Sequence, residues 1–89
     1  MNTNNKKYIF FSLEIINGEY NYFDNQIACI NINEDTNEFV NNFALNYYPD
    51  NNVRQDEDMF YFYNDTITVY INDYKEISEE DYNVLSKYI

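Results

Sequence analysis

Histidine and tryptophan are absent from this 89-residue chain, and cysteine, glycine and proline occur only once each. Without histidine, the usual general base and a common zinc ligand are missing. One cysteine allows no intramolecular disulfide, and one glycine is too few for a phosphate-binding loop or a dinucleotide-binding fingerprint. We therefore expect a protein that is not an enzyme, binds no metal and carries no cofactor.

Basic residues are also scarce. Five lysines and arginines stand against sixteen aspartates and glutamates, which gives a net charge of −11. Each contact with a phosphate needs a lysine or an arginine, so we expect no direct binding to nucleic acid. The same charge argues against an anionic membrane surface. It favours a basic surface on another protein as the partner.

Long apolar runs are missing as well, because no stretch approaches the roughly 18 apolar residues that can span a membrane. Lys6 and Lys7 precede an apolar run, as in a signal peptide, but Ser12 and Glu14 interrupt it. No small-residue cleavage site follows. We therefore expect a cytoplasmic protein that does not associate with a membrane.

Aromatic residues are abundant, with 11 tyrosines and 7 phenylalanines, and many of them have strand spacing. In residues 7–16 apolar side chains alternate with the set Tyr8, Phe10, Ser12 and Glu14, which is the spacing of a strand. The following Asn17-Gly18 predicts a type I′ hairpin turn. The return strand is expected to have a bulge or a bend at residues 24–26. Cys29 lies in its apolar part and is expected to be a small core residue. The two apolar sets are Ile9, Phe11, Leu13 and Ile15 on the first strand, and Tyr20, Tyr22, Ala28, Ile30 and Ile32 on the second.

Two segments have helical features. Asp35 with Glu38 predicts a helix start, and Pro49 follows the expected end. Ser78 predicts the start of a second helix, with three acids in a first turn where the helix dipole favours them. The stripes expected to be buried are Phe39, Val40, Phe43, Ala44 and Tyr47 on the first helix, and Tyr82, Leu85 and Tyr88 or Ile89 on the second.

Residues 59–71 predict a second hairpin that turns at Asn64-Asp65, so the element order is β-β-α-β-β-α. This order predicts an α+β fold, with a four-stranded antiparallel sheet and two helices on one face. Residues 1–5 are expected to form a disordered N-terminus, and residues 6–89 a single domain.

The second hairpin contains the segment "DEDMFYFYND", residues 56–65, where three acids directly precede a strip of aromatics. A turn at Asn64-Asp65 pairs Phe62 with Ile67 and Phe60 with Val69, facing the helices. The opposite face then lacks a cover within the chain. On that face we expect Met59, Tyr61, Tyr63, Thr66, Thr68 and Tyr70, joined by Tyr8, Phe10 and Phe23 from the first hairpin.

Two interpretations of this face stay open. Tyrosines suit exposed strands, and a run of acids is commonly a solvated surface. Aromatic anchors framed by carboxylates are instead typical of a surface that docks a basic cleft. The alternative interface is the helical side, where Asp35, Glu38 and residues 79–81 are expected to gather. The candidate partner-binding residues are Asp56, Glu57, Asp58, Tyr61, Tyr63, Asp65, Tyr70, Glu79, Glu80 and Asp81.

The chain resembles small phage-encoded anti-CRISPR proteins. The resemblance lies in its small size, its acidity, its missing catalytic groups and the acidic and aromatic surface segment "DEDMFYFYND". The resemblance implies an inhibitor that acts in the cytoplasm of a bacterial host cell. Its partner would be the positively charged nucleic-acid channel of a Cas effector or its guide-RNA complex, where some members act as nucleic-acid mimics. Two other classes remain: an immunity protein that neutralises a basic nuclease toxin, and a homo-oligomeric structural or regulatory domain, for example a homodimer formed through the sheet face.

Overall fold

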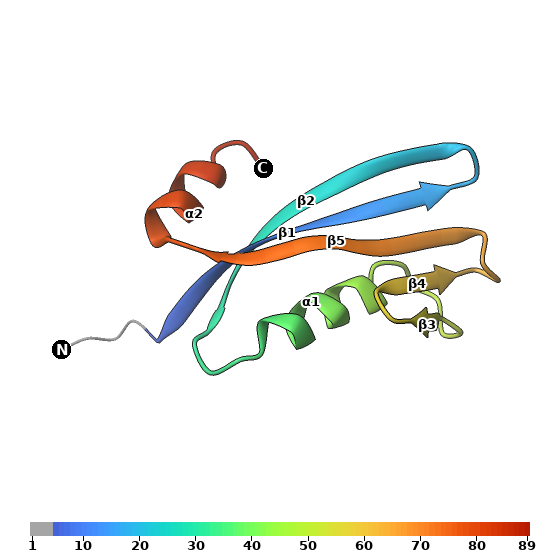
Figure 1. Cartoon of the computed structure of the whole chain (residues 1–89), viewed down its shortest axis with the longest axis horizontal. Helices are drawn as coiled ribbons and strands as arrows, with labels where there is room; N and C mark the ends of the chain where they lie inside the picture. Colours follow the sequence, from blue (N-terminus) through green and yellow to red (C-terminus); the bar gives the residue numbers. More distant parts are fainter. Residues whose placement is uncertain (1–4) are drawn as a thin grey trace.

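Five antiparallel strands form one sheet in the computed structural model, which describes residues 5–89. The strand order is β2-β1-β5-β4-β3, and two helices complete the α+β fold (Figure 1). The N-terminal segment expected to be disordered lies outside the described residues except for Asn5. In chain order the elements are β1 Lys6–Asn17, β2 Tyr20–Asn31, α1 Thr36–Leu45, β3 Arg54–Asp56, β4 Met59–Phe62, β5 Ile67–Ile77 and α2 Glu79–Leu85.

The predicted class is confirmed, but the predicted number of strands was wrong. The additional strand is β3, which pairs with β4 through Arg54 and Tyr61, and through Asp56 and Met59. Its three residues are all exposed. A strand that short and that polar has no alternation of apolar and polar residues, so its sequence resembles a loop.

The first hairpin forms as predicted, but its turn lies one residue later than expected. Asn17 pairs with Tyr20, so Gly18 and Glu19 form the two-residue loop. Gly18 has a φ of 62°, and Glu19 is not among the residues with positive φ. A positive φ at the first loop position alone is the requirement of a type II′ turn rather than type I′.

The bulge expected in the first hairpin was also wrong. β1 and β2 pair without interruption from Lys6–Asn31 to Asn17–Tyr20. The irregularity lies instead between β1 and β5, where Ser12 pairs with Asp73 but Leu13 pairs with Ile71. Asn72 is therefore the extra residue, and the bulge is in β5.

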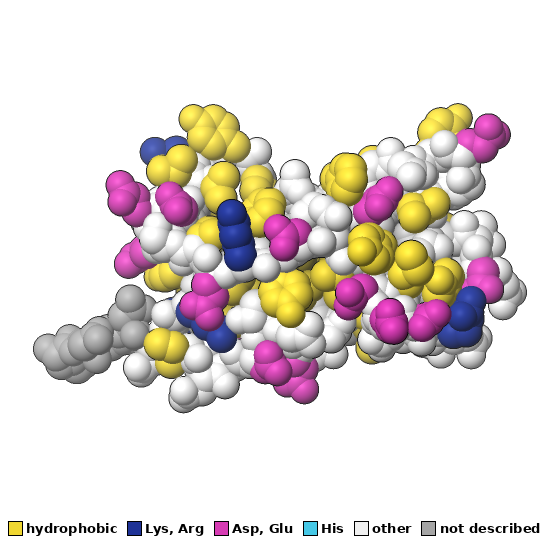
Figure 2. Space-filling model, viewed as in Figure 1, with side chains coloured by type: hydrophobic (Ala, Val, Ile, Leu, Met, Phe, Trp, Pro, Cys, Tyr) yellow, Lys and Arg dark blue, Asp and Glu magenta, His cyan; other side chains and the backbone are white. Residues whose placement is uncertain are grey.

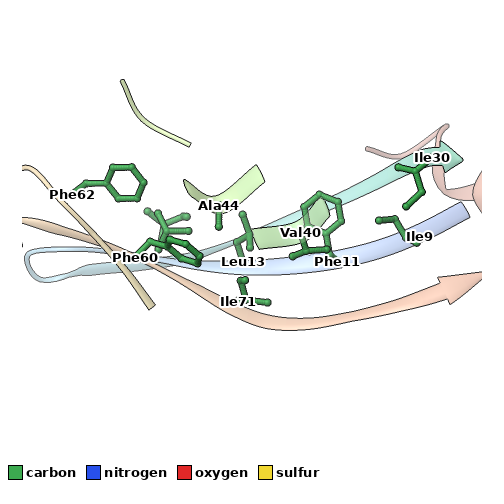
Figure 3. Packing of buried hydrophobic residues seen from close by; sticks show 11 residues of the cluster. Ile9, Phe11, Leu13, Ile30, Val40, Ala44, Phe60, Phe62 and Ile71 are labelled. Carbon is green, nitrogen blue, oxygen red and sulfur yellow. The ribbon is translucent and has the colours of Figure 1, made fainter. Parts of the chain in front are cut away.

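The core lies between α1 and one face of the sheet (Figure 3). Asp35 caps α1 by accepting a hydrogen bond from the Asn37 N–H. Val40 and Ala44 are fully buried against the sheet, whereas Phe39 and Phe43 are half-buried at its margin. The sheet contributes residues of four strands, namely Ile9, Phe11, Leu13, Ile15, Ile30, Phe60, Phe62, Val69 and Ile71.

The second helix lies on the opposite face of the sheet, so the prediction of two helices on one face was wrong. Tyr82 of α2 packs on Tyr8, with ring centroids 4.8 Å apart. Tyr8 alternates with buried Ile9 and therefore points away from α1. At this end α1 already occupies the other face, because Asn37 donates a hydrogen bond to the Tyr74 hydroxyl. The acids of α1 and α2 consequently do not gather on one helical side.

The sheet extends beyond both helices. The molecule measures 50 × 25 × 19 Å, with a radius of gyration of 14.5 Å, against about 12 Å for a compact domain of this length. The tip of the β1–β2 hairpin projects past the core (Figure 1). There Tyr20, Tyr22 and Phe23 are 77%, 50% and 59% exposed.

A polar cluster beside the core joins the end of α1 to β2. The Tyr47 hydroxyl donates a hydrogen bond to Asp24, which also accepts one from the Gln26 side chain. Burial, then the contact with Asp24, raises the pKa of Tyr47. Burial, then a hydrogen bond with Tyr22, raises the pKa of Tyr48 to about 12. The folded state therefore holds both phenolic protons more tightly than the unfolded state.

These raised pKa values predict a loss of stability in alkali. The contribution is complete below the unfolded tyrosine pKa of about 10 and disappears as the pH rises from about 10 to about 12. Urea unfolding at a series of pH values should show this decline. A Tyr47→Phe/Tyr48→Phe variant should show a shallower decline, and equal slopes for variant and parent would contradict the assignment.

Candidate partner-binding surface

The sheet face opposite α1 is covered by α2 only at one end, and we call the remainder the open face. Strand register decides which residues belong to it, because directly paired residues point to the same side. Phe10 pairs with Ile27, Glu14 with both Phe23 and Tyr70, and Met59 with Tyr70. The residues of the open face are Phe10, Ser12, Glu14, Ile16, Asn21, Phe23, Asn25, Ile27, Arg54, Asp56, Met59, Tyr61, Thr68, Tyr70, Asp73 and Lys75.

Three candidate acids form the turn between β3 and β4. Asp56 pairs with Met59 and lies on the open face. Glu57 has a φ of 55°, and Glu57 and Asp58 form the two-residue loop. All three side chains are exposed. The carbonyl of Asp58 accepts a hydrogen bond from the Ile71 N–H, which fixes the turn against β5. The acids therefore stand at the margin of the open face on an ordered support.

Tyr61 lies on the open face, with the Arg54 guanidinium group stacked over its ring. The Arg54 guanidinium carbon is 4.2 Å from the centre of the Tyr61 ring, and Arg54 also pairs with Asp65 at 3.0 Å. The Tyr61 hydroxyl donates a hydrogen bond of 3.1 Å to the Met59 sulfur. Tyr61 is thus half-buried and positioned within the chain, and the charge of Asp65 is partly offset.

Tyr63 does not lie beside Tyr61, contrary to the sequence prediction. The pairing of Phe62 with Ile67 is as predicted, but Tyr63, Asn64 and Asp65 all have positive φ. Side-chain alternation ends where the backbone leaves the strand conformation. The Tyr63 ring lies 6.0 Å from that of Tyr48, and its N–H donates to Asp50. Tyr63 therefore extends the aromatic row beside the core.

Glu79, Glu80 and Asp81 form a second acidic patch in the first turn of α2. Ser78 caps this helix by accepting a hydrogen bond from the Asp81 N–H, as the sequence predicted. Partial burial, then the nearby Glu79 carboxylate, raises the pKa of Tyr8 beneath the helix. Along β5, Tyr70 and Ile77 are separated by about 20–25 Å. The acidic turn at residues 56–58, which is fixed beside Ile71, and the acids of α2 are therefore well separated along the sheet.

Most of the acids have no basic partner. Within residues 5–89 there are two ion pairs, Lys7 with Glu76 and Arg54 with Asp65. Of the sixteen acids, fourteen are therefore outside an ion pair in the described part of the chain (16 − 2). Figure 2 shows acidic side chains along the whole length of one view and few basic ones. Its upper outline is concave between α2 and the β1–β2 tip.

Sequence reasoning overlooked two acids, Glu14 and Asp73, and two bases, Arg54 and Lys75, on this face. Glu14 and Asp73 point to the open face because they pair with Tyr70 and Ser12. Arg54 is on this face because it pairs with Tyr61, and Lys75 because it pairs with Phe10. The alternation in residues 7–16 identifies the side of Glu14. The face of Asp73 cannot be predicted from the alternation in β5, because the extra residue Asn72 reverses that alternation.

The arrangement offers a surface rather than a cavity. The part of the chain that the structure describes contains no pocket and no cluster of residues able to hold a metal ion. Among its helices, none is long and apolar enough to cross a membrane. No protein-family model matches the chain, and neither a curated protein nor a solved structure matches it.

Proposed function

We propose that this protein is a non-catalytic inhibitor that binds the basic nucleic-acid-handling surface of a bacterial defence nuclease, and that this nuclease is a CRISPR effector. The observation that carries the proposal is the uncompensated charge. Sixteen acids stand against five bases, and only two ion pairs form among residues 5–89. Such a surface attracts a cationic cleft and repels nucleic acid, which competes for the same cleft.

The aromatic residues supply the second half of the proposed interface. Met59, Tyr61 and Tyr70 are half-buried on the open face, and Phe23 is exposed. Acids around such residues accelerate the encounter with a basic partner, whereas desolvated aromatics slow its dissociation. The acidic turn at residues 56–58 lies beside these side chains at the β3–β4 edge of the sheet, and the acids of α2 lie beyond the end of β5. A groove in a nucleic-acid channel offers both contacts.

A panel of purified proteins tests this proposal. Guide-loaded CRISPR effectors and basic nuclease toxins should be assayed for nucleic-acid cleavage with increasing amounts of this protein. We expect at least one effector to be inhibited, less strongly as the salt concentration rises. Inhibition of a toxin alone would replace the proposal by that of an immunity protein. Binding to no member at low salt would overturn both.

A further inference from the structure

The two edges of the sheet are protected to different degrees. β3 is a short edge of three residues, two of them charged, which is a common protection against unwanted pairing. β2 is a long edge, Tyr20–Asn31, without a lysine or a proline and with Asp24 as its one charged residue. A long edge strand of low charge exposes main-chain groups that can pair with another strand.

Hairpin geometry identifies the exposed main-chain groups of β2. Asn17 and Tyr20 close a two-residue loop, so they form a hydrogen-bonded pair, and every second pair after them does the same. The bond from the Ile32 N–H to the Asn5 carbonyl, 2.8 Å long, continues this alternation at the far end. The N–H and C=O groups that point away from β1 therefore belong to Asn21, Phe23, Asn25, Ile27 and Cys29.

The side chains of these five residues lie on the sheet face opposite α1. Asn21, Phe23, Asn25 and Cys29 are exposed, and Ile27 is half-buried. Cys29 was expected to be a core residue, and this expectation was wrong. It pairs with Tyr8, so its side chain is on the face opposite the core. The residues between them, such as Asp24 and Ala28, direct their main-chain groups to β1 and their side chains to the α1 side.

We propose that β2 pairs with β2 of a second copy of this chain in antiparallel orientation, with the two-fold axis at Asn25. In this arrangement Asn25 of one copy forms a hydrogen-bonded pair with Asn25 of the other copy. Phe23 pairs with Ile27 of the other copy, and Asn21 pairs with Cys29 of the other copy. This inference is independent of the proposed inhibitor function.

The sequence of β2 is self-complementary in this register. Phe23 opposite Ile27 is an aromatic–β-branched pair, a combination that stabilises antiparallel sheets. On the α1 side, Tyr22 lies opposite Ala28, and Asp24 lies opposite the amide of Gln26. The pairing from Tyr20 to Ile30 is about 35 Å long. The highly exposed Tyr20 lies opposite Ile30 of the other copy.

The neighbouring registers are less favourable. A shift that moves the axis to Asp24 places two carboxylates directly opposite each other, which is destabilising. A shift to Gln26 moves Tyr20 opposite Ile32, beyond the end of β2. An unrelated acidic or basic peptide lacks the pairing of Phe23 with Ile27 that the second copy supplies. Because each copy carries −11, added salt should strengthen the dimer by screening repulsion.

Sedimentation equilibrium of the whole chain tests the dimer. Asn25→Pro removes an outward N–H and no hydrogen bond to β1, so the fold should persist while the dissociation constant rises at least about tenfold. Asn25→Lys places two like charges at the axis and should have the same effect. Asn83→Lys on α2, with the same charge change, should not weaken the dimer. A monomeric parent at high protein concentration and high salt would overturn the proposal.

Cross-linking tests the register in a Cys29→Ser background. Asn25→Cys places two thiols across the axis, with Cα atoms about 5.5 Å apart in a hydrogen-bonded pair, within disulfide range. Asn21→Cys leaves its two thiols about 27 Å apart, eight residues along the strand. We expect rapid oxidation to a disulfide dimer at position 25 and none at position 21. Equal rates at the two positions would refute the register, and a faster rate at 21 would overturn the axis.

Discussion

Replacing Phe11 by alanine should lower the free energy of unfolding by about 3–5 kcal/mol. Phe11 is 1% exposed, and it stacks edge-to-face on Phe43 and Phe39 with ring centroids 4.9 and 6.1 Å away. Its removal leaves a cavity between β1 and α1, where two rings lose their partner. Domains have a total stability of about 5–15 kcal/mol, and a chain this short lies near the lower end. The variant should therefore be largely unfolded at moderate urea concentrations.

The matched control is Phe23→Ala, because it removes the same atoms from the neighbouring strand. Phe23 is 59% exposed on the open face, so its loss should change the stability by less than about 1 kcal/mol in dilute, monomeric protein. Urea unfolding followed by circular dichroism compares the two variants. Equal midpoints for Phe11→Ala and the parent would mean that α1 does not pack where the structure places it.

Reversing Asp56, Glu57 and Asp58 together to lysine should slow association with the inhibited partner by at least about tenfold at low salt. These side chains are exposed, and none is in an ion pair among residues 5–89. Their reversal therefore costs the fold little but removes the nearest attraction to a basic cleft. Stopped-flow or surface-plasmon kinetics measures the rate, and a thermal melt checks that the fold remains.

A second triple variant separates local attraction from net charge. Glu19, Glu34 and Glu38 lie away from the open face, in the hairpin turn, before α1 and in its first turn. Either triple reversal adds six charges and changes the net charge from −11 to −5. We expect the control to keep most of the association rate. Equal losses in the two variants would show that the total charge matters and the turn at residues 56–58 does not.

The sequence predicts sides of strands well wherever apolar and polar residues alternate. Ile9, Phe11, Leu13 and Ile15 are all buried as expected, and the pairing of Phe60 with Val69 is as predicted. The hairpin was also predictable from Gly18, although the turn type was not. Asn17-Gly18 satisfies type I′, while Gly18-Glu19 satisfies type II′, and the chain adopts the latter.

Features that depend on contacts between distant segments were not predictable. The side on which α2 packs follows from α1 occupying the other face near Tyr74. The displacement of Tyr63 follows from three consecutive positive φ angles at residues that sequence patterns assign to a strand and a tight turn. In the candidate surface, Tyr61, Tyr70 and the turn acids lie on or beside one face, whereas the acids of α2 lie apart from them, beyond the end of β5.

Displacement of nucleic acid tests the proposed function most directly. A labelled nucleic acid bound to the inhibited nuclease should be titrated with this protein while its fluorescence anisotropy is followed. If the acidic surface occupies the basic cleft, the nucleic acid should be released. The variant with lysine at residues 56–58 should release much less nucleic acid at the same concentration. A ternary complex in which the nuclease keeps its full affinity for nucleic acid would contradict the proposal.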